Sequence, residues 1–205
     1  DSTLALSMNR WIAYDDFNDR MFYFRTNRNG ISANAAIWDC ATRTVTASFV
    51  ISPTPGKTSW ATYSDVNNRY YVSFHNLTND MALTWIDAAT LAMGTTATSQ
   101  FHDYIKYDKY TQKIFANSGA GTKLIRVFDP VTDTIITSIG LNNGTFEDME
   151  HDSCTNCSVI FNDWGNPPIG GLAVLDDTWT PRNYIGAYPD TGTFYTYGMC
   201  YNERD

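Results

Sequence analysis

The phrase VFDPVT, residues 127–132, decides how this chain folds, because variants of it recur along the sequence. Most copies carry two hydrophobic residues, an aspartate, two further residues and a threonine. The other copies are IWDCAT at 37–42, WIDAAT at 85–90 and a degraded VLDDTW at 174–179. Their aspartates are 48, 42 and 47 residues apart in the order Asp39, Asp87, Asp129 and Asp176. Such regular spacing indicates an internal repeat.

A second marker, a tyrosine that precedes a polar turn, repeats with the same period. It is found at Tyr14, Tyr63 and Tyr107, and His151 and then Tyr197 take the same place later in the chain. The separations are 49, 44, 44 and 46 residues. Because two independent markers keep the same period and phase, chance does not explain the repeat.

Each unit divides into four short strands separated by turn residues. In the second unit these are SWATYSD, RYYVSFH, MALTWIDA and AMGTTATSQF. Four strands in about 42–49 residues are typical of a β-propeller blade. We therefore expect an all-β fold, a single β-propeller domain over residues 1–205. Its four complete blades are expected at about 11–58, 59–101, 102–145 and 146–193, with lone strands at 2–8 and 194–205.

The sequence is compatible with several ways of closing the blades into a ring. Four blades suffice for a small closed propeller. A five-bladed ring would need strands from a partner chain or from a longer protein. An unpaired terminal strand is also a template for strand addition. The expected partners are therefore further copies, joined through the terminal strands into a filament or array, or the rest of a larger parent chain.

The stretch KIFANSG…KLIRVFDPVTDTIITSIGL, within residues 113–141, resembles the repeat of YVTN-type β-propellers. That repeat is similar in layout to those of NHL and lactonase-like propellers. The resemblance extends over about residues 11–190 at the level of the repeat. It implies the fold and a structural role for Asp129, Pro130 and Thr132, and it carries over no active-site residue. Propellers host enzymes, lectins and scaffolds alike, so it implies little about function.

The recurring aspartate has a structural explanation. An Asp side chain accepts hydrogen bonds from backbone N–H groups about two residues further on, and a nearby Thr closes the other side of the turn. We therefore interpret Asp39, Asp87, Asp129 and Asp176 as turn formers rather than metal ligands or catalytic groups.

Composition and charge exclude some classes of function. The chain is 43% hydrophobic, 15% aromatic and 18% charged, which suits strands and turns. A net charge of −8 argues against a nucleic-acid binder, which would need a basic face to replace the counterions of phosphate. No apolar run is long enough to predict a membrane span.

Cysteines and sequons favour a secreted or cell-surface glycoprotein. A lone CxxC is a weak signal for zinc or redox chemistry, so we expect Cys154 and Cys157 to form a local disulfide, with free thiols as the alternative. Three glycosylation sequons begin at Asn76, Asn143 and Asn156, each in an expected loop.

The densest group of titratable residues is FEDMEHD at 146–152, at the start of an expected innermost strand. One hypothesis is a lactonase-like hydrolase with Glu147, Glu150 and His151 as catalytic residues. In it a divalent cation such as calcium would be held by His102, Asp103 and Asp148. The alternative, which we favour, is that polar residues line the channel because they are solvated there. On that interpretation no residue is catalytic and no cofactor is bound.

Most aromatic residues have the spacing of blade packing, and the exceptions lie in expected loops. Among these, Trp164, Trp179 and Tyr188 are candidates for binding, with carbohydrate as a possible ligand. The leading hypothesis is a non-enzymatic extracellular propeller that acts as a binding or structural subunit (adhesion, lectin-like or filament-forming). The alternative is the metal-dependent hydrolase.

Overall fold

The computed structural model describes residues 12–26, 33–51, 57–75, 82–101, 104–117, 124–140, 145–152, 157–163, 171–176 and 178–185. Within these ranges every regular element is a β-strand, and sixteen strands form four antiparallel four-stranded sheets. The all-β class and the four four-stranded units expected from the sequence are confirmed. The lone strands expected at 2–8 and 194–205 lie outside these ranges.

Each sheet contains four strands that are consecutive in the chain, and we call the sheets blades 1 to 4. Blade 1 is β1 (Ile12–Asp15), β2 (Arg20–Thr26), β3 (Ala33–Asp39) and β4 (Thr44–Ile51). Blade 2 is β5 (Lys57–Ser64), β6 (Arg69–His75), β7 (Thr84–Asp87) and β8 (Met93–Thr95). Blade 3 is β9 (Ile105–Asp108), β10 (Lys113–Asn117), β11 (Leu124–Asp129) and β12 (Thr134–Gly140). Blade 4 is β13 (Thr145–Asp152), β14 (Cys157–Asp163), β15 (Gly171–Leu175) and β16 (Pro181–Ile185).

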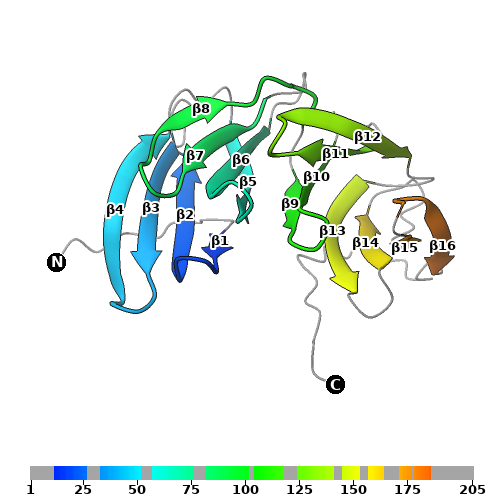
Figure 1. Cartoon of the computed structure of the whole chain (residues 1–205), viewed down its shortest axis with the longest axis horizontal. Coiled ribbons are helices and arrows are strands. Elements are labelled where there is room, and N and C mark those ends of the chain that lie inside the picture. The colour runs from blue at the N-terminus through cyan, green and yellow to red at the C-terminus, as the bar shows by residue number, and fades with distance from the viewer. Residues whose placement is uncertain are drawn as a thin grey trace.

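The blades follow one another along an arc, with the first strand of each nearest the middle (Figure 1). Neighbouring innermost strands pack together in chain order: β1 against β5, β5 against β9 and β9 against β13. No comparable contact joins β1 to β13 among the described residues. Among the described residues the fold is therefore propeller-like, and its four sheets do not close into a ring.

The two middle blades pack through both faces. Side chains alternate across a strand, so Phe22 and Phe24 of β2 point to one side and Met21 and Tyr23 to the other. We call the side toward the next blade the trailing face and the side toward the preceding blade the leading face. Phe22, on the trailing face of blade 1, stacks on Tyr70 of blade 2 at 4.6 Å between ring centroids. Burying such a ring contributes about 1.5–3 kcal/mol.

Three hydrophobic cores result, one between each pair of adjacent blades. Blades 1 and 2 share a core that includes Phe24, Ile37 and Val72. Blades 2 and 3 meet through Leu83 and Phe128 in a second core. The third core lies between blades 3 and 4. Consecutive blades are thus held mainly by apolar burial.

The expected aspartate turns are present in all four blades. In each, a backbone N–H two or three residues further on donates to the carboxylate: Thr42 to Asp39 at 2.7 Å, Thr90 to Asp87 at 2.7 Å, Val131 to Asp129 at 2.9 Å and Thr178 to Asp176 at 2.9 Å. Each turn also holds one non-glycine residue at positive φ, namely Arg43 (57°), Leu91 (60°), Asp133 (57°) and Trp179 (59°). It is the fourth residue after the aspartate in blades 1 to 3 and the third in the shorter turn of blade 4. An aspartate turn therefore recurs with the sequence repeat, and the aspartates are turn formers.

Candidate functional site

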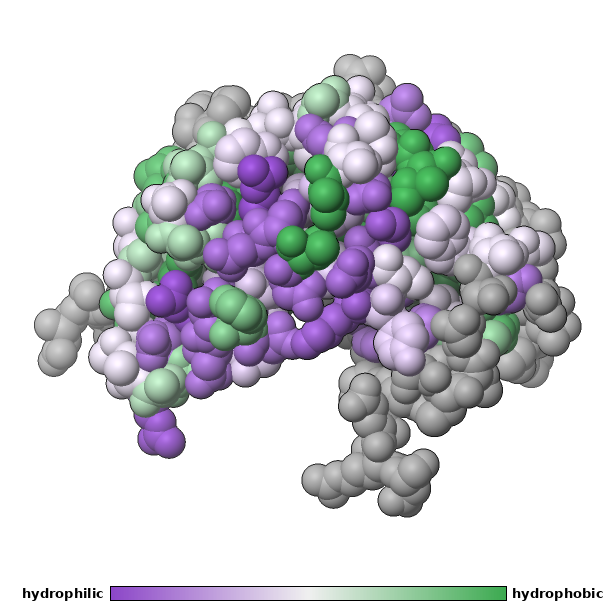
Figure 2. Space-filling view, in the orientation of Figure 1, coloured by the Kyte–Doolittle hydropathy of each residue, from purple (hydrophilic) through white to green (hydrophobic). Residues whose placement is uncertain are grey.

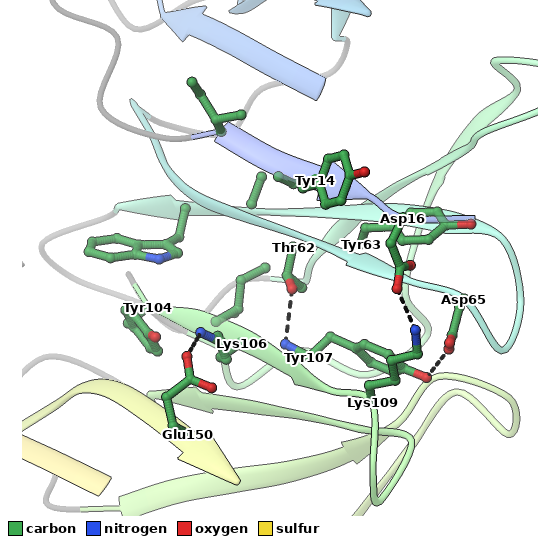
Figure 3. A pocket seen from close by; sticks show the side chains of 15 residues that line it. Tyr14, Asp16, Thr62, Tyr63, Asp65, Tyr104, Lys106, Tyr107, Lys109 and Glu150 are labelled. Atoms are coloured by element: carbon green, nitrogen blue, oxygen red, sulfur yellow. Dashed lines mark hydrogen bonds and ion pairs between the residues drawn. The ribbon is translucent and has the colours of Figure 1, made fainter. Parts of the chain in front are cut away.

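A cavity of about 610 Å³ lies among the innermost strands of the four blades. We call it the channel groove. Its walls come from β1, β5 and β9 and the turns that follow them, and from Glu150 of β13 (Figure 3). Hydrophilic residues also gather across the middle of the face shown in Figure 2. A volume of this size falls in the range of about 300–1,000 Å³ found for small-molecule sites.

Contacts between different blades position the polar side chains of the groove. Lys106 of β9 forms a salt bridge with Glu150 of β13, with 2.8 Å between Nζ and Oε1. Lys109, in the turn after β9, pairs with Asp16 in the turn after β1. The blades that frame the groove are therefore linked through its walls.

Tyr107 joins blades 2 and 3 twice. Its backbone N–H donates to the hydroxyl of Thr62 at 2.9 Å, and its own hydroxyl donates to the carboxylate of Asp65 (Figure 3). Burial and the Asp65 carboxylate raise the pKa of Tyr107, and burial together with Asp15 raises the pKa of Tyr63. Both phenols therefore stay neutral hydrogen-bonding groups at physiological pH.

The groove is close to neutral although the chain carries a net charge of −8. Three carboxylates line it, and the two lysine ammonium groups offset most of their charge. Aromatic rings complete the walls: Trp60 stands edge-on to Tyr104, with 4.5 Å between ring centroids. The groove therefore offers hydrogen bonds and aromatic surface without a strong field of either sign.

His151 lies outside the groove, between blades 3 and 4. Its Nδ1 is 3.7 Å from Asp108 Oδ2 and 3.2 Å from Ser158 Oγ, and its ring stacks on Tyr110 at 4.3 Å. A serine nucleophile relay needs the hydroxyl and the carboxylate on opposite ring nitrogens, whereas both are here on Nδ1. The side chain is only 8% exposed, and the arrangement is not that of a serine nucleophile relay.

The structure does not bring the two described members of the hydrolase cluster together. Glu150 lines the groove and His151 does not, because successive side chains of a strand point to opposite faces. Glu147 and Asp148 lie in β13 without described side chains, and His102 and Asp103 lie outside the described residues. In the part of the chain that the structure describes, no three His, Cys, Asp or Glu side chains form a possible metal site.

The aromatic candidates and the covalent sites have separate locations. Trp179 is half-buried and packs edge-on to Phe115 at 6.2 Å between ring centroids. Cys40 has a free thiol, and Cys157 begins β14. The others lie outside the described residues: Trp164, Tyr188, Asn76, Asn143, Asn156 and Cys154. The disulfide and the glycosylation sites therefore stay predictions.

Sequence reasoning missed Lys106, Lys109 and Asp16. Lys106 and Glu150 immediately precede the tyrosine marker of their units, 44 residues apart. Aligning the units on that marker would have revealed opposite charges at equivalent positions of adjacent blades. That signal was available in the sequence.

No protein-family model matches the chain, and no curated protein matches it. Among solved structures it is similar to hydrazine synthase from Kuenenia stuttgartiensis, a protein that contains a β-propeller. The TM-score is 0.66 at 13% identity, over 91% of this chain and 53% of that chain. The chain thus spans about half the length of its structural neighbour. At this identity the likeness shows the propeller-like fold alone. None of the described segments forms a helix able to cross a lipid bilayer.

Proposed function

We propose that the chain is a non-enzymatic, extracellular or cell-surface binding module whose ligand occupies the channel groove. The observation that supports this is the groove itself, a cavity of about 610 Å³ walled by all four blades. The sequons and cysteines support the extracellular setting. The corner Asp129-Pro130-Val131-Thr132 supports kinship with YVTN, NHL and lactonase-like repeats. Assembly through the terminal strands remains part of the proposal.

The chemistry of the walls favours a neutral, polyhydroxylated ligand, that is, a carbohydrate. Charged groups in the groove neutralise one another, as Lys106 and Glu150 do, so an ion would gain little there. Hydroxyl groups would find donors and acceptors in these side chains. The apolar face of a sugar ring would find aromatic surface at Trp60, which lines the groove and is half-buried.

The hydrolase alternative stays a prediction, since four of the six side chains assigned to it are not described by the structure. Metal analysis of the purified protein, with lactone turnover measured before and after chelation, tests it directly.

Replacing Lys106 by methionine tests the proposed site. A glycan array identifies the ligand, and isothermal titration calorimetry measures its affinity for both proteins. We expect Lys106→Met to weaken binding at least about tenfold, because a hydrogen bond to a charged group contributes about 1.5–3 kcal/mol.

Lys113→Met is the matched control. Lys113 lies in the same blade and also forms a salt bridge, 3.1 Å from Asp129, but it does not line the groove. Its loss should leave glycan affinity unchanged. Equal affinity in wild type and Lys106→Met, or no binding to any glycan on the array, would contradict the proposal.

A further inference from the structure

The leading face of blade 1 is less buried than the leading faces of the other three blades. We compare three equivalent residues in each blade, one from each of its first three strands. In blades 2 to 4 all these side chains are buried against the preceding blade: Ala61, Val72 and Ile86, then Ile105, Ala116 and Phe128, then Met149, Ile160 and Leu175. The corresponding residues of blade 1 are Ile12, Tyr23 and Trp38.

The leading face of blade 1 is apolar and open. Ile12 is 61% exposed, whereas Ala61 is 7% and Ile105 0% exposed at the same position. Tyr14 is 54% exposed, against 6% for Tyr63. Tyr23 and Trp38 are only half-buried. An exposed apolar face of this kind marks an interaction site.

A polar contact recurs between blades and is also incomplete at blade 1. Tyr107 donates to Asp65 of the preceding blade, and His151 lies 3.7 Å from Asp108 of the preceding blade. At the same place in the repeat, Tyr14 donates to Asp19 of its own blade at 2.8 Å, and Tyr63 donates to Asn68 of its own blade at 2.9 Å. Tyr63 also lies beside Asp15 of the preceding blade, which raises its pKa, whereas the described acids beside Tyr14 all belong to blade 1.

Blade 4 has the residues that this face requires. Asp152 ends β13 at the place in the repeat that Asp15 and Asp108 hold in β1 and β9. Val159 pairs with Glu150 and Val174 in the sheet, the register that Phe115 holds with Lys106 and Val127. Phe115 is a buried trailing-face residue of blade 3. By place in the repeat, Asp152 thus corresponds to Asp15 and Asp108 and Val159 to Phe115, which contact the blade that follows theirs.

We propose that the leading face of blade 1 docks on the trailing face of blade 4 of a second copy of this chain. The four described blades of each copy offer one such leading face and one such trailing face, so two copies can make two identical contacts and close a ring. A head-to-tail contact closes in this way when its rotation permits. The ring has eight blades, within the range of about four to eight blades found in propellers.

The mass of the 205-residue chain in solution tests the proposal. Sedimentation equilibrium should give twice the 23.1 kDa of one chain. Ile12→Asp places a charge in the proposed contact and should raise the dimer dissociation constant at least about 30-fold. Its fold should persist, because Ile12 is exposed in the single chain, and circular dichroism checks this. Ile136→Asp is the matched control, since Ile136 is an exposed isoleucine of β12.

A mixing experiment distinguishes head-to-tail contact from a contact between two copies of blade 1. Val159→Asp should also give folded monomers. Mixing these with Ile12→Asp monomers leaves one unaltered contact available and should restore a weaker dimer. Wild-type monomers at high micromolar concentration would overturn the proposal. A dimer unaffected by Ile12→Asp, absence of rescue on mixing, or an open series of larger oligomers would also overturn it.

Discussion

The carboxylates of the outer turns are the individual residues on which the repeat depends most directly. Asp87 accepts hydrogen bonds from the N–H and hydroxyl of Thr90 and from the N–H of Ala89, at 2.7, 2.9 and 3.0 Å. These bonds, led by that from the Thr90 N–H, outweigh burial and lower the pKa of Asp87 from its ordinary 3.8. The turn is therefore held by an ionised side chain.

Asp87→Ala should destabilise the protein by about 1 kcal/mol at pH 7, the usual cost of losing a side chain that caps backbone N–H groups. A lowered pKa in the folded state means that the ionised side chain stabilises the fold above the unfolded pKa. That stabilisation is lost as pH falls through the folded pKa. The difference between variant and wild type should therefore shrink below about pH 4.

Urea denaturation at pH 7 and at pH 3 measures this difference. Asp16→Ala is the control, because the exposed pair of Asp16 with Lys109 should contribute little at either pH. A difference between Asp87→Ala and wild type that is as large at pH 3 as at pH 7 would show that the carboxylate charge is not involved.

At the scale of the element, the short outer strand β8 depends on a glycine. Gly94 pairs with Trp85 across the β7–β8 ladder. A Cβ at Gly94 would lie 2.7 Å from Cε2 of the Trp85 ring and closer still to Cζ2. The Arg69 guanidinium stacks on the same ring, 4.1 Å from its centroid. The indole therefore lies across Gly94, so β8 needs a residue without a side chain at this position.

Gly94→Ala should destabilise the protein by about 1–3 kcal/mol, the usual effect of overpacking, since the indole has to move. Gly140→Ala is the matched control in an outer strand, because nothing lies within 4 Å of a Cβ built there. Thermal unfolding of both variants gives the comparison. Equal melting temperatures for the two variants would mean that the Trp85 ring moves aside without loss.

At the scale of the whole molecule, the sequence predicts the blades well because blade formation is local. The tyrosine marker and the aspartate turn lie within one unit, and each can be recognised from its own neighbours. The groove could not be predicted in the same way, because its contacts join residues far apart in the chain. Lys109 and Asp16 are separated by 93 residues and Lys106 and Glu150 by 44. Whether the blades close into a ring likewise depends on the curvature of the whole arc, which no single unit of the sequence reveals.

Nearest-neighbour packing predicts a gradient of stability along the arc. Blades 2 and 3 are covered on both faces, whereas no core of described residues covers the leading face of blade 1. In dilute solution the amides of β2 should therefore exchange with deuterium faster than those of β6. Raising the protein concentration should slow the exchange of the β2 amides and leave that of the β6 amides unchanged. Hydrogen exchange followed by mass spectrometry measures both. Equal protection of β2 and β6 at low concentration would contradict this account.

The sameness of the contacts between blades has an evolutionary consequence. A unit duplicated in tandem, about 44 residues from Tyr63 to Tyr107, would carry its own leading face, trailing face and acid. It could therefore be inserted between its parents without a new interface having to arise. Gene duplication would then change the number of blades per subunit, and with it the number of subunits that complete a circle. Relatives with longer or shorter chains should differ in oligomeric state before they differ in the structure of any single blade.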